Sequence, residues 1–388
     1  MSGNKNKIIF FRVILSLVLS YVTQWYLCSQ SDELLLQSII ESKLYYKFSH
    51  DIKAQNTESA CFDYCCIGKD IKAKECYQNI YGPVHFIEKQ NYQSTNSATF
   101  IFDYIKKHQP RIVAINEAHH ASEHRIVMHS MLERLYRNGY RHLAIEALSS
   151  DDHDINIRKF PKFVWSGNYI KDPEFGNMVR YALKLGFTLI PYDQRGPLRA
   201  QLAAEAICNH LTVKQINKLV IFAGFDNISE KEINQKKSMM MYLKECLNTD
   251  PFTISQTKYL SLLMKYNPPT SGLSYILTNK NDEVYRGETE DVDVALFCGK
   301  KDVDDALVIQ GQVLIKIKAP KMKIPFPSLV LAKIKNEGLL AVPVDIAEIN
   351  TSKDLKKLKL SLFKGFEYII EFVERNYETY HTQSLTVK

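Results

Sequence analysis

From about residue 98 onward, short apolar runs alternate with longer segments that have helical spacing. The apolar runs have the length of β-strands and cover residues 111–115, 141–145, 187–192 and 219–223. The segments with helical spacing cover residues 98–108, 123–138, 176–185, 198–210 and 238–246. Parallel strands need a long crossover between them, usually a helix, so this alternation predicts parallel βαβ units. We therefore expect an α/β fold, with a mostly parallel sheet flanked by helices.

The segments on either side of this region have a different character. Residues 29–97 are polar and irregular apart from a helical patch over 33–46, and they are predicted to be a lead-in. The chain after residue 305 is richer in β-like runs, namely 313–317, 339–344 and 358–362. These runs are expected to complete the sheet and then to form a small β-rich subdomain. The predicted organisation is a signal sequence or N-terminal anchor (1–28), the lead-in (29–97), the α/β domain (98–305) and a C-terminal β-rich region (306–388).

The N-terminus has the pattern of an export signal. Lys5, Lys7 and Arg12 precede or interrupt an apolar run over residues 8–27, and a basic start before a short apolar stretch is typical of a secretory signal. Cys28 closes the run, so a lipid anchor stays open, and the length of the run leaves a membrane anchor open as well. We expect a periplasmic, secreted or membrane-anchored protein that contacts a membrane only through this segment.

The cysteines are consistent with an oxidising compartment. Four of them cluster in the lead-in: Cys61, Cys65, Cys66 and Cys76. Two local disulfides are favoured over a zinc knuckle, because the spacing lacks a Cys-x-x-Cys pair on each side. Three others stand singly in apolar surroundings and are predicted to be buried packing residues: Cys208, Cys246 and Cys298.

Charge and common motifs exclude several classes of function. The formal net charge is +7, but the lysines and arginines are spread along the chain, so no nucleic-acid partner is expected. The chain has no Gly-x-Ser-x-Gly elbow, P-loop or dinucleotide fingerprint. Serine hydrolase, NTPase and dehydrogenase functions are therefore disfavoured.

Polar residues follow each of the four predicted strands, where ligands bind in parallel α/β sheets. The first strand is followed by Glu117, His119, His120, His124 and Arg125. The ends of the second, third and fourth strands supply Glu146, Asp193 and Asn227. We expect these side chains to converge at one edge of the sheet. Because His119 and His120 are adjacent, only one of them is expected to point fully inward.

Carboxylates beside imidazoles provide what general acid–base catalysis needs. Glu117 or Glu146 is expected to orient His120, which would act as the general base. Arg125 is expected in the first turn of a helix capped by Ser122, facing the mouth of the site and stabilising negative charge. The alternative is a divalent metal held by His119 and His124 with a carboxylate.

The segments 116–120, 123–125 and 144–147 resemble the first βαβ unit of erythromycin esterase-like proteins, and the Glu-x-His pattern is similar to their haem-binding ChaN-like and Tiki relatives. By position, the resemblance implies catalytic roles for Glu117 and His120, with Glu146 as the second carboxylate. It also implies that His119 and His124 are ligand-like. Asn116 stands where the family has glycine, and Asn227 stands where we expect a histidine.

The sequence therefore supports two hypotheses. The first is an exported hydrolase that activates water on a small-molecule ester or amide through Glu117, His120, Glu146 and Arg125. In it, His119, His124, Asp193 and Asn227 would contact the substrate. The alternative is a haem- or metal-binding envelope protein on the same scaffold, without catalysis.

Overall fold

The computed structural model describes residues 46–53, 55, 57–81, 92–163, 165–257, 274–298 and 311–388. The expected export signal and Cys28 lie outside these residues, as does the predicted helix over 33–46 except for its last residue. Within the described ranges, no helix combines the length and apolar character that crossing a bilayer requires.

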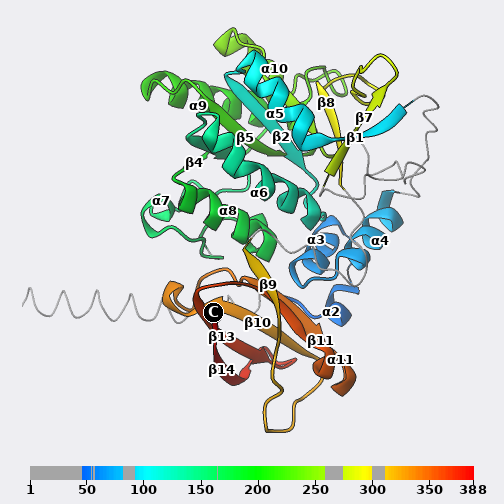
Figure 1. Cartoon of the computed structure of the whole chain (residues 1–388), viewed down its shortest axis with the longest axis vertical. Helices are drawn as coiled ribbons and strands as arrows, with labels where there is room; N and C mark the ends of the chain where they lie inside the picture. The colour runs from blue at the N-terminus through cyan, green and yellow to red at the C-terminus, as the bar shows by residue number, and fades with distance from the viewer. Residues whose placement is uncertain are drawn as a thin grey trace, which may run out of the picture. The chain divides into compact units, whose positions relative to one another are not determined.

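A large sheet dominates the α/β part of the molecule (Figure 1). In the part of the chain that is described it has eight strands, in the order β1-β7-β8-β6-β2-β5-β3-β4. The parallel strands are β2 (Ile112–Glu117), β3 (His142–Ile145), β4 (Thr188–Pro191), β5 (Leu219–Gly224), β6 (Phe252–Ser255) and β8 (Val294–Cys298). The strands β1 (Tyr92–Asn96) and β7 (Ser274–Asn279) add an antiparallel edge. The predicted mostly parallel sheet is confirmed.

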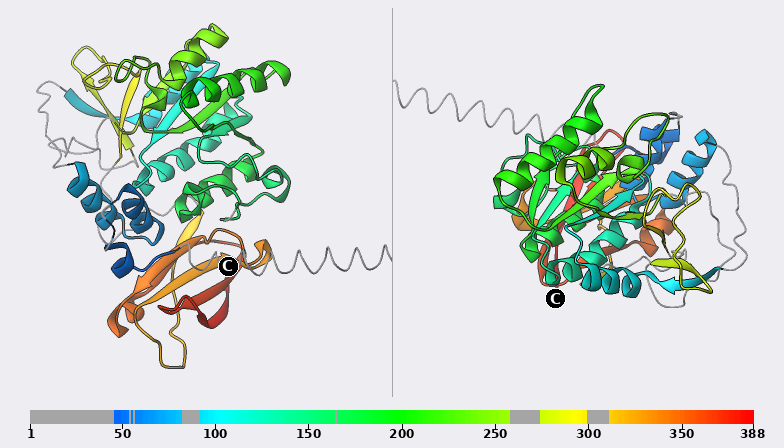
Figure 2. Two further views of the ribbon diagram at one scale, coloured as in Figure 1. Left: turned by 180° about the vertical axis from the view of Figure 1, so that it is seen from behind. Right: turned by 90° about the horizontal axis from the view of Figure 1, so that it is seen from above.

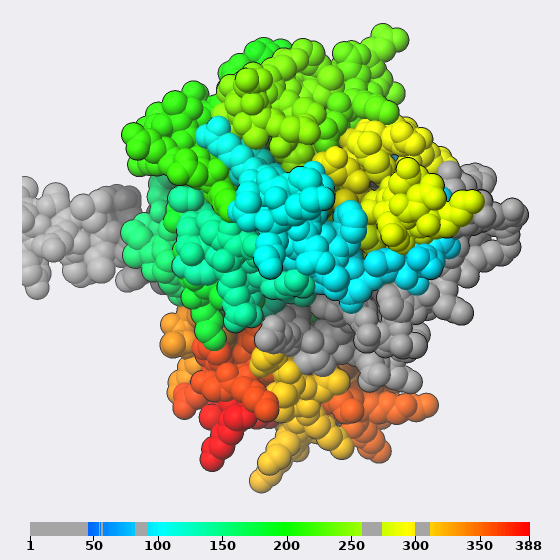
Figure 3. Space-filling view, turned by 45° about the horizontal axis from the view of Figure 1, so that its top comes forward, coloured from blue at the N-terminus to red at the C-terminus, as the bar shows by residue number. Residues whose placement is uncertain are grey.

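Helices cover both faces of this sheet (Figure 2). One face packs against α5 (Ser97–His108), α6 (Ser122–Arg137) and α8 (Pro173–Leu185), and the other against α9 (Arg199–Val213) and α10 (Met239–Leu247). Successive strand residues point to opposite faces, so Val113 and Ile115 of β2 join one core while Ile112 and Ala114 join the other. Figure 3 shows α5 on the surface beside the β7–β8 region, which it contacts through β7.

The four strands that carry candidate residues lie within two residues of their predicted ends. The predicted cap of α6 is wrong. The N-cap of α6 is Ala121, without a side-chain cap, and Ser122 already lies inside the helix. Its hydroxyl instead donates a 2.7 Å hydrogen bond to Asp70, the first residue of α4 (Asp70–Tyr81), which packs against this end of α6.

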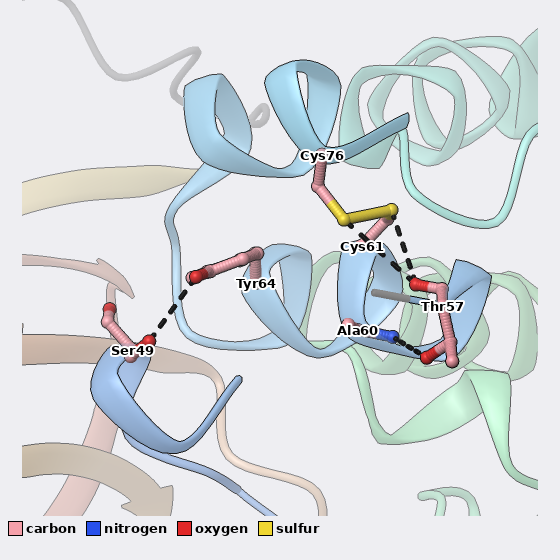
Figure 4. The surroundings of a disulfide bond; sticks show 6 residues. All are labelled: Ser49, Thr57, Ala60, Cys61, Tyr64 and Cys76. Atoms are coloured by element: carbon pink, nitrogen blue, oxygen red, sulfur yellow. Dashed lines mark hydrogen bonds between the residues drawn. A yellow bond between two sulfur atoms is a disulfide. The ribbon is translucent and has the colours of Figure 1, made fainter. Parts of the chain in front are cut away.

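The lead-in is more ordered than expected. It forms α2 (Ser49–Lys53), α3 (Glu58–Cys66) and α4 (Asp70–Tyr81), and its last residues form β1 of the large sheet. A disulfide between Cys61 and Cys76 joins α3 to α4 (Figure 4).

The expected pairing of the cysteines is wrong in two respects. Cys65 and Cys66 are buried free thiols, so the lead-in contains one disulfide among its described residues. Cys208 and Cys246 form a second disulfide between α9 and α10. The two helices pack in one core, which brings together cysteines that stand far apart in the sequence.

The C-terminal region is β-rich, as predicted, and has its own core. Its four-stranded antiparallel sheet has the order β11-β10-β13-β14, and β9 pairs with β12. The strands are β9 (Gln312–Lys316), β10 (Ser328–Ile334), β11 (Asp345–Ile349), β12 (Lys359–Phe363), β13 (Phe366–Val373) and β14 (Thr379–Val387). None of these strands joins the large sheet. Residues 339–344, predicted as a strand, instead form a connection in which Ala341 makes one isolated bridge to Lys162.

Candidate functional site

The parallel strands bring the candidate residues to one edge of the sheet. Glu117, the last residue of β2, pairs with Gly224 at the end of β5. On the other side of β5, Ile145 of β3 pairs with Phe222, so Glu146 comes level with the same edge. The backbone N–H of Gly224 donates a 2.7 Å hydrogen bond to Glu146. The predicted convergence of these strand ends is confirmed.

Glu117 is the buried anion of the site. Its side chain is 3% exposed, and Nε of Arg125 donates a 2.6 Å hydrogen bond to its Oε2. Its Oε1 lies 3.0 Å from Nδ1 of His119. Burial acts to raise the pKa of Glu117, but Arg125 and His119 outweigh it and hold the pKa at about 2. Glu117 is therefore ionised at neutral pH.

His119 is the histidine that contacts Glu117, and its ring also lies near Glu146. An ionised carboxylate only accepts hydrogen bonds, so the contact with Glu117 places the proton on Nδ1 and leaves Nε2 as an acceptor. The Cε1–Nε2 edge of the ring faces Gly224: a Cβ at that position would lie 2.7 Å from Cε1, 3.0 Å from Nε2 and 3.1 Å from Oε1 of Glu146. Both atoms thus flank one point at the edge of the sheet.

Aromatic rings hold His119 in place. The ring of Tyr169, from the 3-10 helix η1 (Tyr169–Lys171), stacks on it with centroids 3.7 Å apart. Phe225, from η2 (Phe225–Ile228), meets it edge-on at 5.3 Å. The side chain of His119 nevertheless remains 19% exposed, so solvent reaches this ring.

Glu146 is the second carboxylate, and its environment differs from that of Glu117. Its Oε2 accepts hydrogen bonds of 2.7 Å from Gly224 N and from Nδ2 of Asn227, while its Oε1 accepts one of 2.8 Å from Nη2 of Arg199. Burial nevertheless raises the pKa of Glu146 above its ordinary value. The two carboxylates beside His119 thus have pKa values shifted in opposite directions, which is common where acid–base roles are divided.

Asp193 and Asn227 support Glu146 and make no direct contact with His119. Asp193 accepts two hydrogen bonds from Arg199, at 2.7 and 2.9 Å, and Arg199 in turn reaches Glu146. Asn227 binds Glu146 directly. Its amide therefore occupies the position of the expected histidine as a hydrogen-bond donor to the carboxylate.

The structure contradicts the expected orientation of His120. Its ring stacks on Tyr77 of α4 at 3.9 Å, and no hydrogen bond or ion pair between described residues joins it to Glu117 or Glu146. Burial, with a contribution from His124, lowers the pKa of His120 to about 3. The adjacent side chains of His119 and His120 point in different directions, and Glu117 contacts His119.

His124 is also buried and neutral. Its Nδ1 accepts a 2.9 Å hydrogen bond from the backbone N–H of Ala118, which fixes the turn after β2. Burial lowers its pKa to about 4. These contacts give His124 a structural role in holding the loop that carries His119.

Arg125 was predicted to face the mouth of the site. It is instead fully buried. Besides Glu117, it donates 2.7 Å hydrogen bonds to Asp172 and to the carbonyl of His119. Its guanidinium also lies near the rings of Phe62 and Phe175. Arg125 is therefore a positioning residue that fixes Glu117 and His119, and it is not accessible to a substrate.

Asn116 stands where the resemblance leads one to expect a glycine, and it ties together the loops at the carboxyl edge. Its Nδ2 donates a 2.6 Å hydrogen bond to the carbonyl of Phe225, and its Oδ1 accepts one of 2.6 Å from the backbone N–H of Gln256. These bonds connect β2 to the segments that follow β5 and β6.

The sequence prediction did not include three residues around His119: Tyr169, Arg199 and Phe225. Arg199 carried a signal, since it lies in the first turn of the predicted helix over 198–210 that follows the third strand. Phe225 follows the fourth predicted strand, but nothing in the sequence assigned it a role. Tyr169 carried no local signal, because its importance depends on a ring contact across the fold.

The residues present do not fit the predicted divalent metal. Across the described ranges, no group of three or more His, Cys, Asp or Glu side chains is placed to hold a metal ion. Nδ1 of His119 and Nδ1 of His124 are both engaged by other partners. Haem binding stays a prediction that no contact described above favours.

Comparisons with known proteins found weak structural likenesses. No family model matches the chain, and no curated protein matches it. A solved structure described as "Bacterial protein toxins" is 12% identical, with a TM-score of 0.30, and the match covers 45% of this chain and 40% of that one. The type III effector HopBA1 is 12% identical, with a TM-score of 0.33, over 56% of this chain and 98% of its own.

A third likeness is to RRSP, a MARTX toxin effector domain from Vibrio vulnificus CMCP6. It is 13% identical, with a TM-score of 0.28, over 44% of this chain and 40% of that one. The present chain thus spans 40% of the length of two of these three structures. TM-scores this low support no argument about function.

Proposed function

We propose that this protein hydrolyses small-molecule esters or amides, with His119 as the general base. The observation that carries the proposal is the 3.0 Å contact between Glu117 and Nδ1 of His119, with the Cε1–Nε2 edge of the ring facing Gly224 beside Glu146. A carboxylate that fixes the tautomer of a histidine and stabilises its protonated form is the arrangement that catalytic imidazoles use. The resemblance of the first βαβ unit to erythromycin esterase-like proteins agrees with this chemistry.

In the proposed reaction, Nε2 of His119 takes a proton from a water molecule while the water oxygen attacks the carbonyl carbon of the substrate. The ionised Glu117 stabilises the imidazolium that forms. The imidazolium then returns its proton to the leaving alcohol or amine as the bond to the carbonyl carbon breaks. His119 suits this role better than His120, whose pKa of about 3 makes it a poor base near neutral pH.

Arg199 takes the role first assigned to Arg125. Its side chain is 47% exposed and lies at the same edge of the sheet, where it binds Glu146 and Asp193. A guanidinium held in place by two carboxylates can stabilise negative charge that develops on a substrate oxygen. Glu146 accepts hydrogen bonds near Nε2 and would orient the attacking water.

The test is a hydrolysis screen of a panel of small esters and amides with purified protein. We expect His119→Ala to lose at least about 100-fold in kcat/KM on any substrate found, the usual size of a general-base contribution. His153→Ala is the matched control, because His153 is an exposed histidine of the same α/β region and should keep full activity. Undiminished turnover in His119→Ala, or no turnover of any panel member by the wild type, would overturn the proposal.

We also propose that the protein is exported, on the basic and apolar pattern of residues 5–27. Fractionation of producing cells, with antibody detection of the chain, tests this directly. Retention of the full-length chain in the cytosolic fraction would contradict it.

A further inference from the structure

We infer that three aromatic side chains, Phe225, Tyr77 and Tyr81, form the substrate-binding wall of this site. The substrate would then carry an aromatic group, flat and apolar, next to the bond that is cleaved. The inference rests on the proposed hydrolase function and names its substrate class. It comes from a row of ring contacts that leads from the surface to His119.

The row is continuous. Phe225 meets the ring of His119 edge-on at 5.3 Å, and Tyr77 lies parallel to Phe225 with centroids 6.5 Å apart. Tyr81 is one helical turn beyond Tyr77 on α4 and packs on it at 4.5 Å. Residues four apart on a helix share a face, so α4 presents both tyrosines on one side.

These rings are more exposed than their apolar surface alone would favour. Tyr81 is 56% exposed, and Tyr77 and Phe225 are only half-buried. Aromatic rings that remain accessible beside a catalytic group provide flat surfaces on which a ligand ring can stack. A small, fully polar substrate would leave these surfaces in water and gain nothing from them.

The backbone of Phe225 gives an independent reason to assign this row a function. Its φ is +37°, in the left-handed region that bulky side chains rarely adopt. Such strain persists only where the surroundings enforce it, and it concentrates at functional sites. Here Asn116 enforces it by donating a 2.6 Å hydrogen bond to the carbonyl of Phe225. A glycine would relieve the strain, but it would remove the ring that faces His119.

Helix α4 is fastened so that its tyrosines stay in place. The Cys61–Cys76 disulfide joins it to α3 one residue before Tyr77. Lys74 forms a 2.6 Å ion pair with Glu123 at the start of α6. The disulfide holds α4 against α3 and the ion pair holds it against α6, as expected if the wall must keep its position relative to His119.

Three esters test the inference: methyl acetate, benzyl acetate and methyl phenylacetate. The last two add one phenyl ring, on the alcohol side or on the acyl side. We expect kcat/KM for at least one phenyl ester to exceed that for methyl acetate by about tenfold or more, the scale of one aromatic contact. The preference should appear mainly as a lower KM.

The variants Tyr81→Ala and Phe225→Leu should reduce this preference ratio by about tenfold. Using the ratio cancels any general loss of activity caused by moving His119. Trp165→Ala is the matched control, because Trp165 is an aromatic side chain, 38% exposed, outside the row, and its loss should leave the ratio unchanged. Thermal unfolding of each variant shows that it is folded.

Each outcome separates the two proposals. Equal hydrolysis of the three esters, or a ratio that neither variant changes, would overturn the aromatic wall and leave the hydrolase standing. Failure to hydrolyse any ester or amide would overturn the hydrolase and the wall with it. A ratio that falls in Tyr81→Ala and Phe225→Leu but not in Trp165→Ala would support the inference.

Discussion

Replacing Arg125 by methionine would remove the cation that two buried carboxylates share. The side chains of Arg125, Glu117 and Asp172 are at most 3% exposed. The pKa of Glu117 is about 2 against an ordinary value of 4.5, so its ionised form is favoured by a net of about 3 kcal/mol after the cost of burial, at about 1.4 kcal/mol per pKa unit. Removing one partner of a buried ion pair typically costs about 3–5 kcal/mol. We expect Arg125→Met to lower the free energy of unfolding at pH 7 by about this amount.

The pH dependence of this loss checks its cause. In the wild type, the lowered pKa of Glu117 gives stability that is fully present above about pH 4.5 and is lost as the pH falls toward 2. In Arg125→Met, burial would raise the pKa of Glu117 with His119 left to oppose it. Protonation of Glu117 would therefore relieve the variant as the pH falls below 7. The difference between the two proteins should therefore shrink between pH 7 and pH 4.

Urea unfolding followed by circular dichroism at several pH values measures both quantities. The double variant Arg125→Met/Glu117→Gln removes one of the two stranded charges, with Asp172 left, and should recover part of the loss at pH 7. A loss below about 1 kcal/mol at pH 7 would refute the reasoning, as would a loss that stays constant down to pH 4.

Three further results are expected. Gly224→Ala should lower kcat/KM by at least about 100-fold with little change in thermal stability. The backbone there suits alanine (φ −84°), but the new Cβ would lie 2.7 Å from Cε1 of His119; full activity would contradict the site geometry. His129→Leu should raise the free energy of unfolding by about 1 kcal/mol, because both ring nitrogens of His129 are buried and no described residue hydrogen-bonds to them; a loss in urea unfolding would show that they are satisfied. Cys76→Ala should lower the free energy of unfolding by about 3 kcal/mol, the value expected for a disulfide closing a loop of this length. An unchanged urea midpoint under oxidising conditions would exclude that contribution.

The sequence was sufficient to predict four of the eight described strands of the large sheet, β2 to β5, and the edge that carries the site. Buried parallel strands are continuous apolar runs, so β2, β3, β4 and β5 could be located directly. Residues that follow such strands gather at one edge whatever the details of packing. The convergence of Glu117, Glu146 and Asn227 needed no further information.

The sequence could not predict how adjacent side chains divide between interior and site. His119 and His120 are adjacent residues of the same type, and what separates their roles is what each contacts in the fold. Glu117 and Tyr169 contact His119, whereas Tyr77 stacks on His120. Both tyrosines come from segments that are far in the sequence from the loop that carries His119 and His120. Arg125 was placed at the mouth because it lies in the first turn of the helix that follows the first strand, but the combined charges of Glu117 and Asp172 hold it in the interior.

The central claim is that His119, and not its neighbour His120, is the base. The most direct measurement is kcat/KM of His119→Asn and His120→Asn on the same ester, with both variants shown to be folded. The account predicts a loss of about 10²–10⁴ for His119→Asn and a much smaller change for His120→Asn. Equal losses, or a larger loss in His120→Asn, would contradict it.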